Sequence, residues 1–382
     1  MATIEIPIYM RGVTGRMARR QHLERSLMAI AKEGGLKTPG GDVIMPKPYL
    51  LGRDAKKLKP LADEYGLPSG DDINVAFEDK NEFRIFFEGA ITKVHHAGIT
   101  QAIDAGMHIF SEKPITLTID EAIDVAKRAA AKGIKGGVVQ DKRYLPGTAA
   151  LAHVINSGMI GDPFHVQLEF GYWVFPDSGT RPDWNSDKEA GGGIVYDMVA
   201  HWDYVLQMLV GRPVNVSALT DMAVKQRTRD GQPVTTTAED SVYATFKSEQ
   251  GVICSTASSW CRRPRKRGLL EIKVQGTKGA AEAYLDRCFV MTDERTPVIA
   301  WDPDTASRVE FDDGWERIEA PECPSNAFRY QWEKFLLHLV CDGENPADLV
   351  EGAQGVEAST RAYESADKNG VPVDIRDIRS IL

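Results

Sequence analysis

Two short segments carry the residues best suited to acid–base chemistry. In the first, a short apolar run ends in Glu112-Lys113-Pro114, which places the Lys113 ammonium at the end of a predicted strand. In the second, three successive glycines precede a predicted helix that carries Asp197 and His201. These two residues are four apart, so their side chains share one face of the helix. A cation can hold an alcohol oxygen, and a histidine beside a carboxylate can take its proton near neutral pH.

Each of these signals also has a purely structural explanation. A Lys-Pro step after a strand is most often a solvated turn, and an Asp–His pair is common on helix surfaces. Asp197, His201 and Asp203 are also spaced for a shared metal ion, but no further His or Cys cluster supports such a site. We therefore predict no metal and treat Asp197 and His201 as a candidate acid–base pair.

The first 145 residues alternate strand and helix patterns. Strands are predicted over residues 4–10, 48–51, 83–87, 107–110 and 137–140, and helices over 16–32, 55–65, 94–105 and 118–132. This alternation predicts a parallel sheet with helices on both faces, a Rossmann dinucleotide-binding domain over residues 1–145. Lys113 then lies at the carboxyl edge of the sheet, where such sheets bind ligands.

Residues 146–382 follow a different pattern. Helices are predicted over residues 148–157, 193–210, 327–341 and 349–368, and strands over 165–174, 215–224, 241–248, 252–260, 269–275, 280–285 and 372–374. Successive strands without intervening helices indicate antiparallel pairing. We therefore predict an α+β domain with a large, mostly antiparallel open sheet that binds substrate and forms oligomers.

A glycine-containing loop after the first strand predicts a cofactor site. The loop residues are Gly12, Val13, Thr14, Gly15, Arg16 and Met17. Dinucleotide folds use glycines here for a tight turn, and the pyrophosphate binds the amides of the next helix. The loop departs from the G-x-G-x-x-G pattern, because Met10 or Thr14 replaces one glycine, depending on the register. A plain strand–helix turn is the alternative explanation.

The end of the second predicted strand bears on the choice between NAD and NADP. NAD enzymes usually carry an acid there that binds the ribose hydroxyls. This chain has Gly52 followed by Arg53. Without a carboxylate to repel it, a 2′-phosphate can pair with Arg53, which favours NADP weakly. An arginine stacked on the adenine of NAD is the alternative.

These segments together resemble the sugar-oxidising dehydrogenases of the glucose–fructose oxidoreductase / inositol dehydrogenase / MocA family. Members of that family combine Glu-Lys-Pro with later glycines, an aspartate and a histidine in this order. The resemblance implies that Lys113, Asp197 and His201 form the catalytic set, with His201 as general base and Lys113 as its electrostatic partner. It also implies that Thr92, Glu112 and Lys113 lie at the cofactor. The expected function is NAD(P)-dependent interconversion of a secondary alcohol and a ketone on a sugar, polyol or glycoside.

Aromatic and polar side chains before the glycine run are candidates for substrate contacts. Aromatic rings stack on the C–H faces of sugars, while polar groups bind hydroxyls. The candidates are Lys142, Trp173, Arg181 and Trp184, beside Asp197 and His201. A basic run over residues 262–267 is either a solvated turn or a clamp for an anionic substrate or a neighbouring subunit.

Composition excludes several classes of protein. The net charge of −9 argues against nucleic acid as the main partner. Five cysteines without Cys-x-x-Cys spacing argue against a disulfide framework and for a reducing compartment. No basic and apolar leader is visible, and no run approaches the roughly 20 apolar residues of a membrane span. We expect a cytoplasmic protein without a membrane partner.

Two other functions remain open at this stage. One is a cofactor-binding regulator on the same fold that performs no chemistry. The other is a reductase of non-sugar carbonyls or dihydrodiols, which the resembled family also contains. The family's use of the open sheet for subunit pairing further implies a homodimer or homotetramer.

Overall fold

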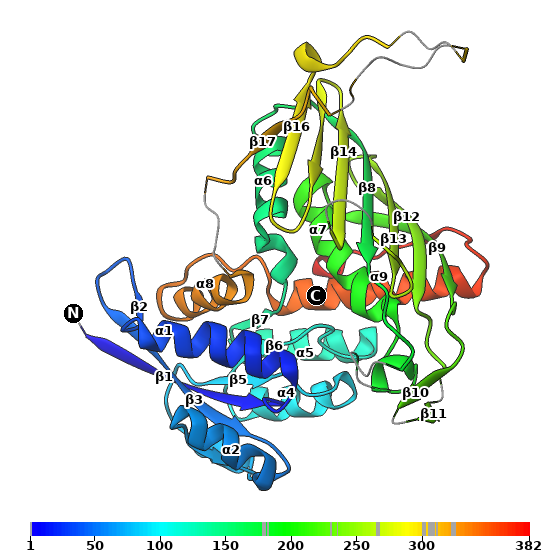
Figure 1. Ribbon diagram of the computed structural model, residues 1–382. Coiled ribbons are helices and arrows are strands. Elements are labelled where there is room, and N and C mark those ends of the chain that lie inside the picture. Colours follow the sequence, from blue (N-terminus) through cyan, green and yellow to red (C-terminus); the bar gives the residue numbers. More distant parts are fainter. Residues whose placement is uncertain are drawn as a thin grey trace.

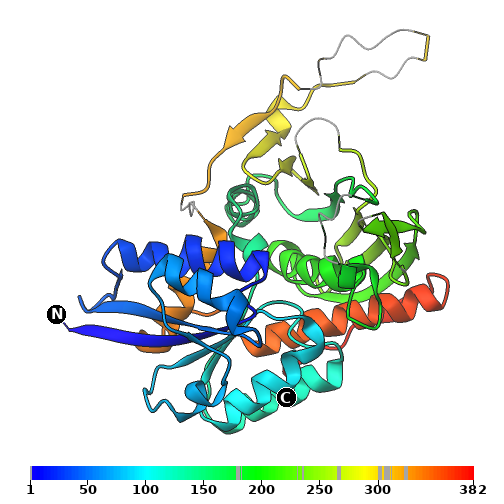
Figure 2. The ribbon, with the colours of Figure 1, turned by 60° about the horizontal axis from the view of Figure 1, so that its bottom comes forward.

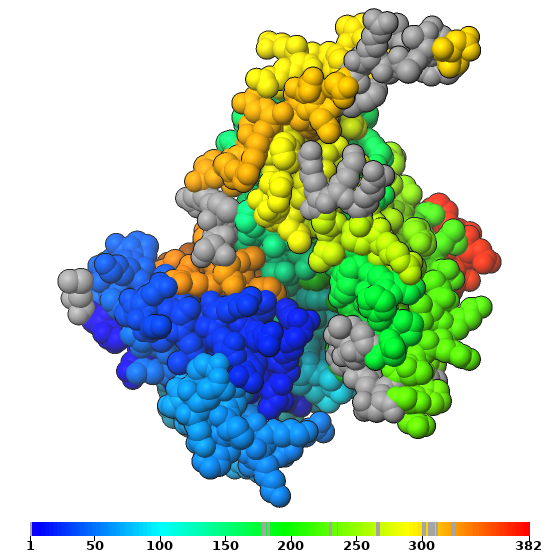
Figure 3. Space-filling view, viewed as in Figure 1, coloured from blue at the N-terminus to red at the C-terminus, as the bar shows by residue number. Residues whose placement is uncertain are grey.

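The computed structural model describes residues 2–177, 181, 183–229, 231–234, 236–264, 268–299, 303–304, 310, 312–321 and 326–382. It contains two large sheets, each packed against helices, that lie one above the other in Figure 1. Arg265, Lys266 and Arg267 of the basic run lie outside the described residues. In the space-filling view, the first part of the chain (blue and cyan) and the second (green and yellow) meet along a recessed seam (Figure 3).

The first sheet confirms the predicted Rossmann fold. Its order is β2-β3-β1-β5-β6-β7, with β4 paired to β3. All of these pairs are parallel except β2–β3. The strands are β1 (Thr3–Arg11), β2 (Leu36–Lys37), β3 (Val43–Leu51), β4 (Ser69–Gly70), β5 (Ile85–Glu88), β6 (His108–Ser111) and β7 (Gly136–Val138). From β1 the chain adds β3 on one side and then returns to add β5 on the other, so the order of the strands switches at β1. The ends of β1 and β5 therefore form the crevice where such folds bind ligands.

Helices cover both faces of this sheet, and local sequence signals set their ends. They are η1 (Ala18–Leu27), α1 (Met28–Lys32), α2 (Ala55–Tyr65), α3 (Asn74–Glu78), η2 (Thr92–Val94), α4 (His95–Asp104) and α5 (Ile119–Ala131). The Asp54 carboxylate accepts hydrogen bonds from the first amides of α2. Thr118 and Glu121 form a reciprocal capping box at the start of α5. Such caps fix where each helix begins relative to the strand before it.

The strand predicted over residues 48–51 is longer in the structure because it begins at Val43. Pro46 and Pro48 lie within this strand, although proline lacks a backbone N–H and is rare in central strands. Both pair with β1 on one side of β3. On the other side, β2 pairs only near Val43 and β4 only near Leu51, so the described strands leave the edge between them open. The prolines therefore interrupt no ladder.

The second sheet has the order β17-β16-β15-β14-β8-β13-β12-β9-β18. All of its pairs are antiparallel except β8–β13, as predicted for a mostly antiparallel sheet. The strands are β8 (Pro163–Gly171), β9 (Pro213–Asp221), β12 (Ser241–Ser248), β13 (Ile253–Ser259), β14 (Leu270–Gly276), β15 (Gly279–Ala283), β16 (Cys288–Thr292), β17 (Glu316–Ile318) and β18 (Val373–Asp374). A separate hairpin pairs β10 (Arg227–Arg229) with β11 (Gln232–Val234).

One face of this sheet packs against α6 (Pro146–Asn156), η5 (Val195–Val199) and α7 (Ala200–Val210). Trp202 of α7 is fully buried there, and its indole N–H donates to the Ser258 hydroxyl on β13. The core of this part therefore also fixes the helix that carries His201, because Trp202 follows it directly.

The last two helices connect the two parts of the chain. From α8 (Ala327–Cys341), Trp332 and Phe335 pack into the core of the first sheet. In α9 (Leu349–Asp367), a Cβ on Gly352 would lie 2.5 Å from Val138 of the first sheet, and one on Gly355 would lie 3.2 Å from Ala200 of α7. Figure 2 shows α9 passing beside both parts. The predicted division at residue 145 stays a prediction, since α8 packs on the first sheet and α9 on both parts.

Candidate active site

The candidate site lies where three parallel strands end. The loop after β1 begins at Gly12, the loop after β5 runs from Gly89 to Thr92, and Glu112 and Lys113 follow β6. The amide of Glu112 donates to the Glu88 carbonyl, which ties the last two loops together. The sheet order thus brings segments about 100 residues apart to one edge.

Gly12 shows why this loop fits a dinucleotide. Its φ of +80° lies in the left-handed region, and a Cβ would stand 2.3 Å from the Gly89 carbonyl carbon. The Gly15 amide donates to the Gly12 carbonyl at 2.9 Å, which closes the tight turn. Met10 is fully buried in β1, and Gly12 and Gly15 are the two glycines of the turn that follows. The loop leaves the following helix N-terminus open to a pyrophosphate.

The remaining predicted cofactor residues divide by exposure. Val13 is buried, whereas Thr14, Gly15, Arg16 and Met17 are exposed at the start of the helix. Thr92 is buried beside Gly191 of the glycine run, with 3.6 Å between its Cβ and a Cβ built on that glycine. Thr92 therefore lies at the junction between the first part of the chain and the second.

Glu112 is held by its neighbours on both carboxylate oxygens. One oxygen lies 2.9 Å from His22 Nε2, and the other accepts the Lys113 amide at 3.2 Å. The Trp332 indole N–H donates to His22 Nδ1 at 3.0 Å, so His22 carries its own proton on Nε2 and donates to Glu112. Burial alone would raise the pKa of Glu112, but His22 and Lys113 outweigh it and lower that pKa. Glu112 thus orients the backbone of Lys113 through its own carboxylate.

At the far end of the crevice, Gly52 and Arg53 follow β3. Arg53 is exposed, and Asp54 accepts the amides of Lys56 and Lys57 as the cap of α2. The nearest acid after the strand is therefore used by the helix rather than free for a ribose.

Asp197 joins the two parts of the chain through a pair of cations. The Lys113 ammonium donates to Asp197 Oδ1 at 2.6 Å and to its backbone carbonyl at 2.7 Å. The Arg181 guanidinium donates to Asp197 Oδ2 at 2.9 Å. Burial alone would raise the pKa of Asp197, but the charges of Lys113 and Arg181 outweigh it and hold that pKa well below its usual range. The carboxylate is therefore an anion at neutral pH.

His201 lies on the same helical face and is 3% exposed. Burial lowers its pKa well below the usual value, and the nearby charges of Lys142 and Lys113 lower it further. Its Nδ1 lies 2.6 Å from the Tyr204 hydroxyl and 3.8 Å from Asp141 Oδ1. The imidazole is therefore neutral, which is the form that can accept a proton.

Arg181 also belongs to an aromatic wall beside this set. Its guanidinium lies 4.0 Å from the centroid of the Trp260 ring, and its Nε donates to the Tyr172 hydroxyl. Farther along the wall, Arg263 lies 3.8 Å from the centroid of the Trp173 ring, while Arg262 pairs with Glu169 of β8. The two described arginines of the basic run that precede Pro264 thus pack on the second sheet.

Part of this arrangement was not predicted from the sequence. Lys142, the predicted pocket residue of the segment 140–143, pairs with its neighbour Asp141 at 3.2 Å, and Tyr204 had no predicted role. Tyr204 lies three residues after His201 on one helix, a spacing that places neighbours on the same face and that would have identified it. Trp184 lies in η4 (Asp183–Ser186). Its backbone carbonyl oxygen would be only 2.3 Å from a Cβ added to Gly192, so η4 packs closely on the glycine run.

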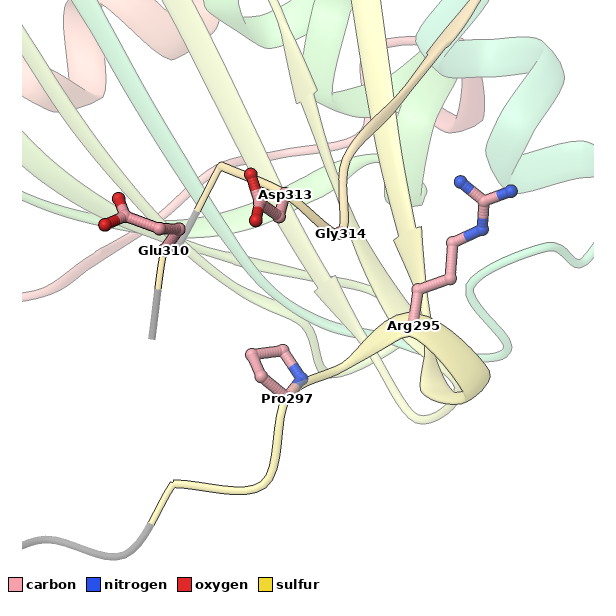
Figure 4. A pocket seen from close by; sticks show the side chains of 5 residues that line it. All are labelled: Arg295, Pro297, Glu310, Asp313 and Gly314. Carbon is pink, nitrogen blue, oxygen red and sulfur yellow. The ribbon is translucent and has the colours of Figure 1, made fainter. Parts of the chain in front are cut away.

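Two other features bear on what the site can bind. In the described part of the chain, no group of three His, Cys, Asp or Glu residues is arranged to hold a metal ion. A hollow lined by Arg295, Pro297, Glu310, Asp313 and Gly314 lies beyond β16, at the end of the second sheet away from the first (Figures 1 and 4). It contains no residue of the candidate site.

Comparison with known proteins decides the family. The model for "Oxidoreductase family, NAD-binding Rossmann fold" matches residues 48–139, and that for "GFO/IDH/MocA C-terminal domain" matches residues 148–282. A D-xylose dehydrogenase of Paenarthrobacter nicotinovorans is 35% identical over 98% of this chain and 99% of its own length. The chain belongs to the Gfo/Idh/MocA oxidoreductase family. This member is thus an oxidoreductase with an NAD(P)-binding domain.

More distant relatives agree with this membership. A D-xylose 1-dehydrogenase (NADP(+)) of Haloferax volcanii is 23% identical over 85% of this chain and 91% of its own length. A levoglucosan dehydrogenase in complex with NADH and levoglucosan superposes with a TM-score of 0.80 at 18% identity, over 98% and 99% of the two chains. That likeness extends to the fold. Among the described residues of this family member, no helix is long and apolar enough to cross a bilayer.

The Gly12 turn provides a test of cofactor binding that needs no substrate. In Gly12→Ala, the new Cβ collides with the backbone after β5, so we expect NAD(P)H binding to fall at least tenfold in a fluorescence titration. Gly34→Ala is the matched control, because Gly34 has a φ of +91° but open space around its Cβ position. Equal binding by the two variants would contradict this placement of the cofactor.

Proposed function

We propose that this oxidoreductase interconverts a secondary alcohol and a carbonyl on a sugar, polyol or glycoside. The observation that carries the proposal is the Asp197 carboxylate bound by both Lys113 and Arg181. It holds an ammonium group at the carboxyl edge of the first sheet, beside the crevice that fits a dinucleotide. Bound NAD(P)⁺ supplies the hydride acceptor for such a reaction.

A pentose is the first substrate to test. The relative that is 35% identical over nearly the whole of both chains is named a D-xylose dehydrogenase. Family relatives at lower identity also carry names of enzymes that act on D-xylose and on 1,5-anhydro-D-fructose. We infer that D-xylose, or an aldose of similar size, is oxidised by this chain.

The proposed roles follow from charge and burial. His201 is neutral, so it is the general base that takes the hydroxyl proton in oxidation. Lys113 is the cation that stabilises negative charge on the same oxygen. The Asp197 carboxylate holds Lys113 in place. Its oxygens accept hydrogen bonds from Lys113 and Arg181, and they have further lone pairs for a substrate hydroxyl.

The substrate groups are proposed to lie along the aromatic wall. Arg181 and Lys142 supply donors to hydroxyls, while Trp173 and Trp184 bound the pocket with apolar surface. Lys142 pairs with Asp141, whereas Asp197 is shared by Arg181 and Lys113, so these five side chains carry one net positive charge. Their N–H donors and the flanking rings suit a polyhydroxylated ligand.

We further propose NADP as the preferred cofactor. The second strand ends in Gly52 and Arg53, and Asp54 is occupied as a helix cap. This leaves an exposed guanidinium, with its neighbouring acid engaged, where the 2′ position of the adenosine ribose is expected. Arg53 with Gly12, Val13, Thr14, Gly15, Arg16, Met17, Thr92, Glu112 and Lys113 makes up the proposed cofactor site.

The protein is also proposed to act as a homodimer or homotetramer in a reducing, cytoplasmic setting. Leu219 and Tyr243 pair across β9 and β12, and they are 54% and 52% exposed on the side of the sheet away from the helices. Two large apolar side chains side by side are typical of a contact surface. Cys254, Cys261, Cys288 and Cys341, the described cysteines, are all free thiols.

The catalytic assignment predicts separable effects on turnover and on cofactor binding. Lys113→Ala and His201→Ala each lower kcat with D-xylose by about 10²–10⁴-fold, because each loses a group that acts on the oxygen. NAD(P)H affinity stays within a few-fold. Lys132→Ala and His96→Ala remove a lysine and a histidine from exposed pairs with aspartates, and they are the matched controls. Normal turnover in either site variant would refute the assignment.

The cofactor preference predicts a selective loss in Arg53→Ala. Removing a charged hydrogen bond to a phosphate lowers kcat/KM for NADP about 10–100-fold and leaves kcat/KM for NAD nearly unchanged. Lys59→Ala, on the exposed side of α2, controls for general loss of positive charge. An equal effect on both cofactors would show that Arg53 contacts the adenine instead.

The oligomer proposal predicts that charge on the open face separates subunits. The parent chain elutes with a mass of at least twice 42.2 kDa in light-scattering chromatography. The double variant Leu219→Lys, Tyr243→Lys shifts to the monomer, whereas Met159→Lys, in the turn after α6, does not. A monomeric parent chain would disprove the proposal.

A further inference from the structure

His201 has a hydrogen-bond partner that sequence motifs do not assign. Its Nδ1 lies 2.6 Å from the Tyr204 hydroxyl, and both side chains are almost fully buried on α7. The role of a histidine in proton transfer depends on which ring nitrogen carries the proton, and the partner of the other nitrogen decides this. The Tyr204 hydroxyl is therefore placed to control His201.

The second contact of Tyr204 limits what its hydroxyl does at rest. The Lys142 backbone N–H donates to the Tyr204 oxygen at 3.2 Å. An amide N–H can only donate, so the phenol oxygen accepts there and keeps its own proton for another partner. Among the described residues, His201 Nδ1 is the one hydrogen-bond acceptor in contact with this hydroxyl. Tyr204 therefore donates to Nδ1, and the neutral ring carries its proton on Nε2.

The surroundings hold Tyr204 in this geometry. The Arg143 guanidinium lies 5.5 Å from the centroid of the Tyr204 ring, within range of a cation–π contact. Asp141 Oδ1 lies 3.8 Å from His201 Nδ1, so a carboxylate flanks the pair. Burial raises the pKa of Tyr204 well above its usual value, and the Asp141 charge raises it further. The phenol thus stays protonated throughout.

We propose that Tyr204 is a positioning residue for the reaction and acts through the Nδ1 of His201. In the resting site its hydroxyl donates to Nδ1, and Nε2–H is the donor offered to a substrate oxygen. In alcohol oxidation, Nε2 must be bare to take the hydroxyl proton as hydride leaves the carbon, so Nδ1 then carries the ring proton and donates to the Tyr204 oxygen. The change between the two neutral forms takes one proton off Nε2 and puts one on Nδ1, so it needs no net proton. The hydroxyl proton that Nε2 then accepts makes the ring an imidazolium, which releases one proton before the next turnover.

A hydroxyl suits this exchange better than the alternatives. A carboxylate only accepts hydrogen bonds and a backbone N–H only donates them, whereas a phenol does both. When Nδ1–H donates to the phenol oxygen, the phenol proton turns toward the Asp141 side of the pair. This inference rests on the proposed function, because it concerns how His201 serves as a base there.

The tautomer of His201 can be measured without any substrate. In ¹⁵N-histidine-labelled protein, long-range ¹H–¹⁵N correlations distinguish a protonated ring nitrogen from a bare one, and His201→Asn identifies the His201 signals. We expect the proton on Nε2 and a hydrogen-bonded, bare Nδ1 in the parent chain. In Tyr204→Phe, the Nδ1 signal moves to that of a nitrogen without a donor. A proton on Nδ1 in the resting parent would overturn the proposal.

The kinetic test compares Tyr204 of α7 with Tyr196 of η5, the helical segment that directly precedes α7. Tyr204→Phe lowers kcat about 10–100-fold, the usual cost of removing the partner of a functional histidine, and leaves KM and NAD(P)H affinity within twofold. Tyr196→Phe removes a hydroxyl that donates to the Leu117 carbonyl and leaves kcat unchanged. Unchanged turnover in Tyr204→Phe, or an equal loss in both variants, would overturn the positioning role.

A second substitution covers the case in which Tyr204→Phe does not fold. A 3-fluorotyrosine at position 204 keeps the ring and the hydroxyl but makes the phenol a stronger donor, so the Nδ1 signal shifts and kcat for oxidation falls. An unshifted Nδ1 signal would overturn the proposal. If the parent chain oxidises no sugar, the proposed function fails, whereas the resting tautomer in the same spectra still decides the role of Tyr204.

Discussion

The bond that the rest of the site depends on is the one between Lys113 and Asp197. Lys113 follows a strand of the first sheet, and Asp197 lies on a helix of the second part, 84 residues later. Both are largely buried, so removing Asp197 would leave an uncompensated cation, which typically costs about 3–5 kcal/mol. Arg181 supplies a second cation to the same carboxylate from a loop before the glycine run. The ion pair therefore requires the two parts of the chain to keep one relative position.

The helices explain how that position is maintained. α9 packs on β7 through Gly352 and on α7 through Gly355, and both contacts leave little room for side chains. α8 adds Trp332 to the first core and, through His22, orients the Glu112 carboxylate next to Lys113. Close helix contacts of this kind resist sliding, because cores are packed to the density of solids. The ends of β6 and η5 are thus held together by elements far away in sequence.

The charges of the site give Asp197 and His201 different protonation states, so the two side chains can have different roles. Asp197 is kept ionised by two cations, whereas His201 is kept neutral by burial and by the nearby lysines. Environments that push two titratable groups in opposite directions are how active sites assign acid and base roles. Here the same lysine contributes to both shifts, since its charge stabilises the carboxylate and disfavours an imidazolium.

Sequence alone predicted the alternation of the first sheet and the antiparallel second sheet. The reason is that period, spacing and strand-end position are local properties. It grouped Lys113, Asp197 and His201 only through the family resemblance, with a substrate hydroxyl or His201, rather than Lys113, as the partner of Asp197. It did not predict that α8 packs on the first sheet, because an amphipathic pattern shows that a helix has a buried face but not which sheet covers it. It gave Tyr204 no role, because the Asp197–His201 spacing explained the helix without it. The position of Trp260 beside Arg181 was not predicted either, because it requires β13 to pair with β8 in parallel, which is a long-range contact.

The two groups of site residues differ in how freely they can change, and this difference bears on how substrate specificity can arise. The groups proposed to act on the oxygen, Lys113 and His201, lie at the ends of regular elements and are fixed by two cores. The aromatic wall proposed to face the rest of a sugar includes Tyr172, Trp173 and Trp260, which follow strands β8 and β13 of the second sheet. Loop and strand-end residues change without disturbing a core, whereas a shift of the ion pair would disturb both cores. Chemistry is thus tied to the packing of the whole chain, and substrate choice to one edge of the second sheet.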